Sequence, residues 1–178
     1  MRSALFQKQL PLGIFIITLT TVLLCLLLTV FLHVFSPDTV LVIEDVKSGQ
    51  ILWQEDIQAG EWFYHEYLHS VEKSPVIEKF KVNRAGEILT MESWTKSFGA
   101  GLPYEQQGTV EMVDGFYVLK DLHRPIHGGA FLMQPSNKYP HTFHFRDHRI
   151  MLSEEPYAST RIKIEVRHLT WLEAILEH

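Results

Sequence analysis

The sequence predicts an all-β domain, an antiparallel sandwich or open barrel, preceded by one N-terminal transmembrane helix and followed by a short C-terminal helix. Two observations indicate this fold class. A long uncharged run lies near the N-terminus, and after it short runs of alternating apolar residues are separated by turn signals about every ten residues. We therefore expect residues 1–36 to be a cytoplasmic tail and transmembrane anchor, and residues 37–178 to be an extracytoplasmic β domain.

The N-terminal run contains no Asp, Glu, Lys or Arg between Lys8 and Asp38. A membrane-spanning helix needs about 20 such residues and the apolar core of a cleaved signal peptide only roughly 7 to 15, so the run predicts a retained anchor. This anchor would contact the lipid of the cytoplasmic membrane through residues 11–35. Arg2 and Lys8 precede it and no basic residue follows until Lys47, which predicts a cytoplasmic N-terminus and a C-terminal domain outside the membrane.

The expected exported part is acidic. Residues 38–178 contain all 21 acidic residues and 14 of the 16 basic ones, a formal charge of −7. This excludes nucleic acid and anionic lipid as expected partners of the domain, but it does not exclude an anionic small ligand, which needs only local positive charge. The only cysteine, Cys25, lies inside the span, so the domain can form no disulfide with itself.

Eleven strands are expected in the domain, each a run rich in β-branched and aromatic residues next to a turn signal. In chain order they are 39–46, 51–57, 62–71, 76–82, 88–97, 109–113, 116–120, 130–133, 141–145, 149–153 and 161–168. Asp114-Gly115 is a strong hairpin turn. The segment 121–140, rich in Gly, Pro, His and Asn, predicts a long loop, and Thr170 to Glu173 match a helix capping box.

A β-hairpin is expected where the strands 62–71 and 76–82 meet across the turn Glu72–Pro75. The expected cross-strand pairs are Val71 with Val76, His69 with Glu78, Tyr67 with Phe80 and His65 with Val82. The His69/Glu78 pair is the polar exception on an apolar face, and a carboxylate there needs a partner. It could fix the register of the hairpin or contact a ligand. Strand alternation places Ser70 on the opposite face, so no catalytic residue is assigned.

Histidine is abundant, with ten residues in all. Five of them crowd the second half: His123, His127, His141, His144 and His148. A zinc or copper site is therefore an alternative. However, the sequence has no strong metal-binding signature, and His141 and His144 would point to opposite faces of a strand. Exposed loop histidines are the expected outcome, and no metal or cofactor is assigned.

Two segments carry a resemblance to a known family. The first is His69-Ser70-Val71-Glu72 with Pro75-Val76 and Glu78, and the second is Phe98-Gly99-Ala100-Gly101-Leu102-Pro103. In both, the chain resembles a bacterial domain-of-unknown-function family, the one numbered eighteen-fifty, of small exported or anchored proteins. The resemblance covers roughly Val40 to Val166. The resemblance identifies motif positions in this chain but implies no catalytic role for them. These positions are His69, Ser70, Glu72, Pro75, Glu78, Gly99, Gly101 and Pro103.

This family is similar in context to companions of TAXI-type TRAP transporters, which use an exported solute-binding protein and membrane subunits to import organic acids. The resemblance implies a non-enzymatic accessory component of solute uptake. It would act by protein–protein contact with the TRAP membrane subunits or the solute-binding protein. Two alternatives stay open: a metal-dependent or other extracytoplasmic enzyme centred on His69, Glu78 and the loop histidines, and a ligand-sensing module.

Overall fold

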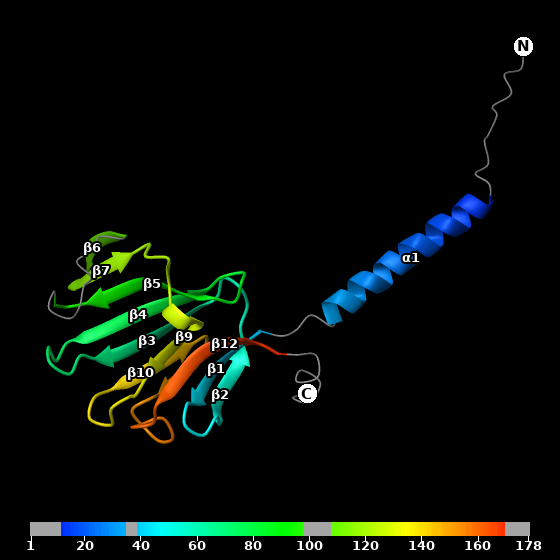
Figure 1. Ribbon diagram of the computed structural model, residues 1–178. Coiled ribbons are helices and arrows are strands. Elements are labelled where there is room, and N and C mark those ends of the chain that lie inside the picture. The colour runs from blue at the N-terminus through cyan, green and yellow to red at the C-terminus, as the bar shows by residue number, and fades with distance from the viewer. Residues whose placement is uncertain (1–11, 35–38, 98–107, 170–178) are drawn as a thin grey trace, which may run out of the picture. The chain divides into compact units, whose positions relative to one another are not determined.

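The computed structural model describes residues 12–34, 39–97 and 108–169. They fall into two units, which are considered separately: the helix α1 (Leu12–Val34) and a β domain within Asp38–Leu169 (Figure 1). The strands of the domain are β1 (Thr39–Asp45), β2 (Ile51–Asp56), β3 (Trp62–Leu68), β4 (Pro75–Val82), β5 (Ile88–Thr95), β6 (Thr109–Val113), β7 (Phe116–Lys120), β8 (Arg124–Pro125), β9 (Ala130–Met133), β10 (His141–Phe145), β11 (His148–Met151) and β12 (Ile162–His168). A short 3₁₀ turn, His127–Gly129, precedes β9.

Helix α1 is long and apolar enough to cross a membrane, with the most apolar stretch at Gly13–Val30. Its 23 residues span roughly 34 Å at about 1.5 Å per residue, against a hydrocarbon core of about 30 Å. Its threonine hydroxyls donate back to the helix backbone: Thr20 and Thr21 both reach the carbonyl oxygen of Ile17 at 2.9 Å. This satisfies hydroxyls that would find no water in a bilayer. The predicted apolar helix is confirmed, and it fits membrane anchoring.

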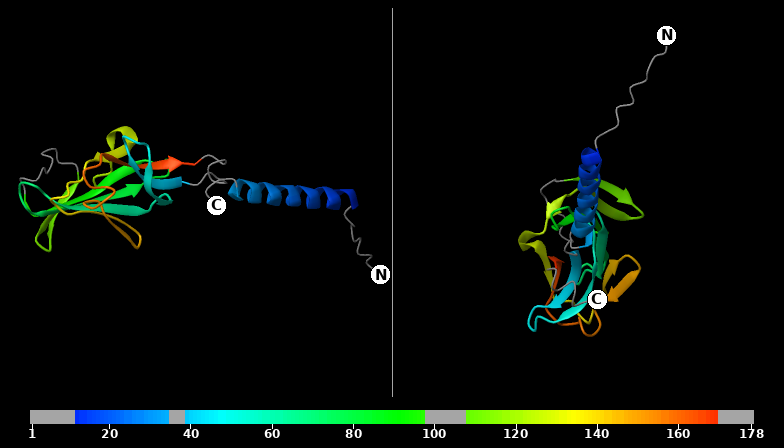
Figure 2. Two further views of the ribbon diagram at one scale, coloured as in Figure 1. Left: turned by 90° about the horizontal axis from the view of Figure 1, so that it is seen from below. Right: turned by 90° about the vertical axis from the view of Figure 1, so that its right-hand side faces the viewer.

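The β domain consists of two antiparallel sheets, as the sequence predicts. The smaller sheet has the strand order β2-β1-β12-β9, and the larger has the order β11-β10-β3-β4-β5-β7-β6, with β8 paired to β5. The two sheets lie as layers over one another (Figures 1 and 2). Pairing of β1 with β12 joins the two ends of the domain sequence, and pairing of β10 with β3 brings residues 141–145 beside 63–67.

The core fills the space between the two inner faces. Its fully buried members are Leu41, Ile43, Ile57, Phe63, Phe80, Val82, Ile88, Phe143, Phe145, Leu152, Ile162 and Ile164. The ring of Phe63 stacks on Phe80, with centroids 5.1 Å apart, and Phe131 of β9 lies 5.4 Å from Phe80. Aromatic rings from both sheets thus meet in the middle of the sandwich and supply a large part of its buried apolar area.

Most predicted strands are confirmed to within a few residues. The β6–β7 hairpin turns at Asp114-Gly115, where both residues adopt the positive φ that such a turn requires. The main difference is β3, which ends at Leu68 and not at Val71. The long segment before β10 contains the short strand β8 and the predicted strand β9. The predicted C-terminal helix lies outside the described residues.

Candidate functional site

The hairpin of β3 and β4 has a different register from the one that the sequence predicts. Tyr67 lies opposite Val76 and His65 lies opposite Glu78, so the predicted His69/Glu78 pair is wrong by four residues. The predicted face is correct, because a shift of four residues keeps every side chain on the same side of the sheet. The carboxylate of Glu78 therefore does have a histidine across the strand, but a different one.

The cause of the shift is a longer turn. Residues 69–74 leave the ladder, and the amide of His69 donates to the carbonyl oxygen of Ser74 at 2.9 Å, while the amide of Lys73 donates to that of His69 at 2.9 Å. Lys73 has a φ of 50°, and the ring of His69 accepts the amide of Glu72 at its Nδ1 atom, at 3.1 Å. His69 thus shapes the turn. Pro75 begins β4, where its missing N–H is tolerated.

Four polar side chains gather on the inner face of the larger sheet: His65, Tyr67, Glu78 and His141. We call them the inner-face cluster. Their strands β3, β4 and β10 are neighbours, and the pairs His65/Glu78 and Tyr67/His141 are directly opposed. The rings of His65, Tyr67 and His141 stack, with centroids 4.9 to 5.7 Å apart. His65 Nε2 lies 3.3 Å from His141 Nδ1, so one ring donates a hydrogen bond to the other.

Burial dominates the electrostatics of this cluster. His65 is only 2% exposed, and burial, with smaller contributions from His141 and His144, lowers its pKa to about 3. Burial also lowers the pKa of His141, raises the pKa of Glu78 and, together with the charge of Glu78, raises the pKa of Tyr67 to about 12. Each group is therefore pushed toward its neutral form, as expected where charge is poorly solvated.

Two groups of the cluster make no hydrogen bond at the positions described next. Among the described residues, His65 Nδ1 is buried with no hydrogen-bond partner, and the carboxylate of Glu78 has no hydrogen bond or ion pair. An unsatisfied buried polar group costs on the order of 1 to 3 kcal/mol of folding free energy, so this cluster lowers the stability of the domain. The free ring nitrogen makes the cluster a candidate for binding a further polar group.

The turn that holds the first family segment contacts the end of β5. Ser97, just after β5, donates from Oγ to Glu72 Oε2 in the turn 69–74, at 3.1 Å. Ser70 is exposed in the same turn. Gly99, Gly101 and Pro103 lie outside the described residues, although Ser97 directly precedes their segment. Of the motif residues that the structure describes, His69, Ser70 and Glu72 lie in the turn, and Glu78 lies on the inner face.

The histidines do not assemble into a metal centre. Within residues 12–34, 39–97 and 108–169, no group of three or more His, Cys, Asp or Glu side chains could hold a metal ion. His141 and His144 point to opposite faces of β10, as predicted: His141 stacks on His65, and His144 stacks on Tyr64 outside. His148 pairs with Glu55 at 2.6 Å. An enzyme centred on a His69/Glu78 pair loses its geometric basis.

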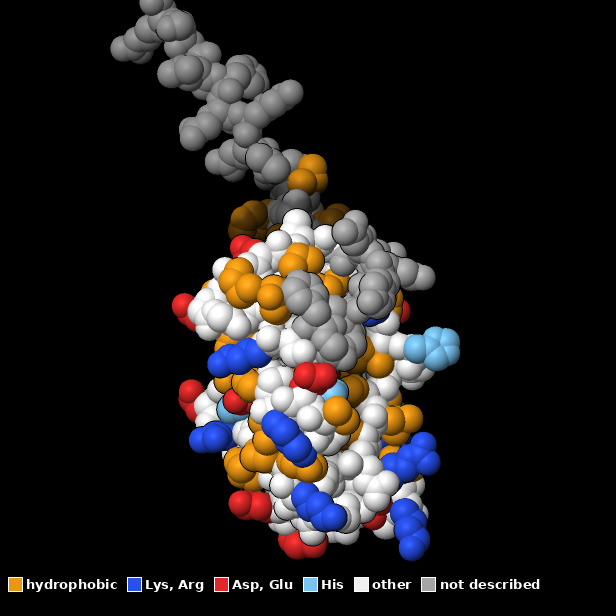
Figure 3. Space-filling view, turned by 90° about the vertical axis from the view of Figure 1, so that its left-hand side faces the viewer, with side chains coloured by type: hydrophobic (Ala, Val, Ile, Leu, Met, Phe, Trp, Pro, Cys, Tyr) orange, Lys and Arg blue, Asp and Glu red, His pale blue; other side chains and the backbone are white. Residues whose placement is uncertain are grey.

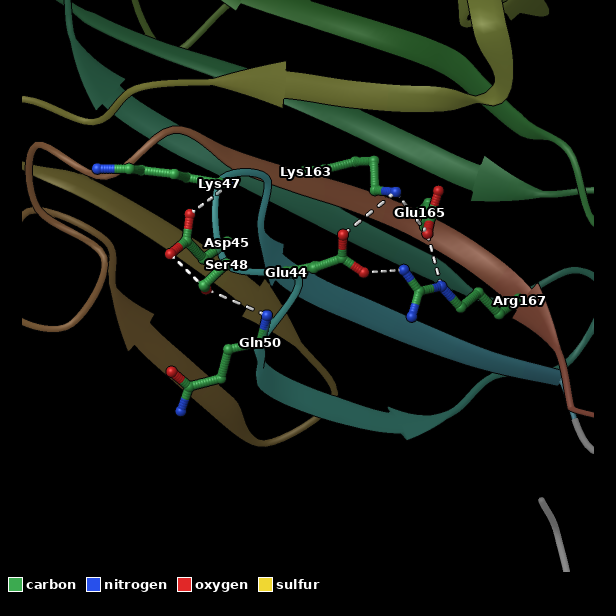
Figure 4. A network of polar contacts seen from close by, with 8 residues as sticks. All are labelled: Glu44, Asp45, Lys47, Ser48, Gln50, Lys163, Glu165 and Arg167. Carbon is green, nitrogen blue, oxygen red and sulfur yellow. Dashed lines mark hydrogen bonds and ion pairs between the residues drawn. The ribbon is translucent and has the colours of Figure 1, made fainter.

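The most extensive ion-pair network in the described residues lies away from this cluster, on β1 and β12 (Figure 4). Glu165 binds Lys163 at 3.1 Å and Arg167 at 2.6 Å, and Glu44 binds the same two cations. Two carboxylates and two cations balance, so the network leaves no net charge for a ligand. Its cross-strand geometry indicates a structural role in pairing β1 with β12.

Sequence reasoning missed His141 as the neighbour of His65. The signal was present in the alternation of β10, which puts His141 on the same face as Phe143 and Phe145. The pattern could not show that β3 is the neighbour of β10, because the two strands are more than seventy residues apart in the chain.

Comparison with known proteins gives one match. The family model described as Domain of unknown function (DUF1850) matches residues 63–152, from β3 to the residue after β11, which includes the whole inner-face cluster. No curated protein and no solved structure matches the chain. Since the match covers half of the sequence and confirms the resemblance of the two segments, the chain belongs to the DUF1850 family.

Proposed function

We propose that this protein is a membrane-anchored, extracytoplasmic accessory component of a TAXI-type TRAP uptake system for organic acids. In this role it contacts the TRAP membrane subunits or the solute-binding protein. Membership of the DUF1850 family supports the proposal through the family's similarity in context to TRAP companions. Helix α1 supports an anchor, and the basic Arg2 and Lys8 before it favour a cytoplasmic N-terminus.

The observation that carries the contact role is the hydrogen bond between Ser97 and Glu72, at 3.1 Å. It fixes the turn 69–74, which holds the first family segment, against the end of β5. Val71 is 77% exposed in this turn, an apolar side chain held by defined backbone hydrogen bonds. At this end of the domain, hydrophobic side chains lie among charges of both signs (Figure 3). A non-obligate protein interface is about as apolar as the rest of a protein surface, so this composition is compatible with a contact site.

Co-purification tests the proposal. The full chain is expressed together with the TRAP membrane subunits and the solute-binding protein of the same genome, and it is isolated from detergent extracts. We expect the wild type to retain the subunits. The amount of co-purified subunits should fall at least fivefold with Val71→Glu. Val110→Glu, a change at a comparably exposed valine of β6, is the matched control and should retain them. A wild-type chain that is consistently free of subunits contradicts the proposal, as does equal loss in both variants.

A second candidate function is a ligand-sensing module, and it is favoured by the unpartnered His65 Nδ1 and Glu78 carboxylate of the inner-face cluster. A polar ligand could satisfy both. A small molecule that raises the melting temperature of the wild type but not that of Glu78→Gln supports this function. A library that shifts both proteins equally argues against it.

A further inference from the structure

A pocket of about 370 Å³ lies on the larger sheet, apart from the inner-face cluster. Strands β4 and β5 supply Lys81, Leu89 and Met91, and the turn after β4 supplies Arg84. His123, from the segment before β8, and Ala59 and Gly60, from the turn before β3, complete the wall. The volume is in the range of small-molecule sites, which lie at roughly 300 to 1,000 Å³.

Donor side chains line this pocket together with the amide of Asn83, whose oxygen accepts the backbone amides of Ala85 and Glu87 at 2.9 Å. Lys81 and Arg84 carry positive charge, His123 offers ring nitrogens, and no carboxylate belongs to the lining residues. One carboxylate adjoins the pocket, because Glu87 accepts a hydrogen bond from the side-chain amide of the lining residue Asn83 at 2.7 Å. In a domain whose formal charge is −7, two cationic side chains beside a single carboxylate are a local exception.

These donors are free to meet a ligand. Among the described residues, the side chains of Arg84 and His123 are exposed and form no hydrogen bond or ion pair. The amino group of Lys81 lies 5.5 Å from the ring centroid of Trp62, a contact that leaves its N–H groups available. His123 adopts a φ of 45°, a conformation that costs a non-glycine residue free energy and that is often found at functional sites.

The rest of the pocket is apolar. Leu89 and Met91 are among its lining residues, and Met91 is 6% exposed. A fully hydrated inorganic anion would gain nothing from contact with these apolar side chains. A carboxylate attached to a short hydrocarbon would contact both the cationic and the apolar side chains. We infer that this pocket binds a small aliphatic carboxylate, with its charged end between Lys81, Arg84 and His123 and its hydrocarbon on Leu89 and Met91. The inference does not depend on the transporter role.

Isothermal titration of the full chain in uncharged detergent tests this inference, with propionate, butyrate, pentanoate and inorganic phosphate as probes. We expect one saturable site for the carboxylates, with affinity rising about threefold for each added methylene group. Phosphate should bind at least tenfold more weakly than pentanoate. Absence of saturable carboxylate binding overturns the inference, and phosphate binding as tight as that of pentanoate overturns the assignment to an organic anion.

Two variants locate the site. Lys81→Gln and Arg84→Gln should each weaken pentanoate binding about tenfold or more, because each removes a charge-assisted hydrogen bond. The matched controls are Lys96→Gln, whose amino group also lies over an aromatic ring, and Arg149→Gln, an exposed arginine outside the pocket. The controls should bind as the wild type does. Unchanged binding in the pocket variants, or equal loss in the controls, refutes the site, provided that thermal unfolding shows all four variants to be folded.

Discussion

Replacing His65 with glutamine should change how the stability of the domain depends on pH. Burial lowers the pKa of His65 to about 3 in the folded protein, against 6.5 for the unfolded chain. Between these values the unfolded state binds more protons, so acidification favours unfolding, and stability is lost as the pH falls below 6.5. From pH 7 to pH 5 the loss through His65 is about 2 kcal/mol, at about 1.36 kcal/mol for each pKa unit. Glutamine cannot titrate and removes this loss.

Denaturant unfolding of the full chain in detergent, followed by tryptophan fluorescence, measures the effect, since Trp53 packs against Phe143 in the core. The difference in unfolding free energy between wild type and His65→Gln should move by about 2 kcal/mol in favour of the variant from pH 7 to pH 5. Using the difference cancels the titration of His141 and Glu78 to first order. The exposed His127→Gln is the control for loss of a surface histidine. A difference that stays within about 0.5 kcal/mol over this range refutes the buried, neutral state of His65.

Three further predictions concern stability and use the same unfolding measurement. Phe63→Ala should cost about 3 to 5 kcal/mol, because it opens a cavity in the stacked aromatic core; a cost below about 1 kcal/mol would contradict that packing. Glu78→Gln should stabilise the protein at pH 7 and have less effect at pH 4: burial raises the pKa of this carboxyl, so its ionisation disfavours the folded state as the pH rises above 4.5. Gly108→Ala should lower the free energy of unfolding more than Gly115→Ala does. A Cβ on Gly108 would collide with the carbonyl oxygen of Lys120, whereas a Cβ on Gly115 would have no other atom within 4 Å. Equal losses would show that only the positive φ matters.

The sequence was sufficient for the elements but not for all of their pairings. Alternation and turn residues located the strands, and Asp114-Gly115 fixed one hairpin completely. At the β3–β4 hairpin the same alternation gave the correct face but the wrong partner, since period-two patterns cannot distinguish registers that differ by an even number of residues. The length of the turn decides the register, and that length depends on backbone hydrogen bonds around His69 that no composition rule reveals.

The candidate sites could be predicted only where their residues are close together in the sequence. The residues at 69–78 were visible as an unusual cluster because they are close in the sequence. The partner His141 and the pocket around Lys81 were not, because tertiary pairing assembles them from distant segments. The pocket joins the turn before β3, the β4–β5 hairpin and the segment before β8. The sequence supported only the general expectation that an acidic domain can still bind an anion. That expectation named no residue.

The corrected register changes the meaning of the family segment. If His69 faced Glu78, one polar pair would serve both the fold and an exposed contact. With His65 in that position, the two tasks separate: His65 and Glu78 lie on the inner face, where a change alters stability first, and His69 lies in the turn with Val71, where a change alters the exposed surface first. A residue that shapes an exposed turn can affect a partner without a large effect on the core. Within the family segment, the turn 69–74 is therefore the better place to look for protein contact, and His65 and Glu78 are the better place to look for effects on stability.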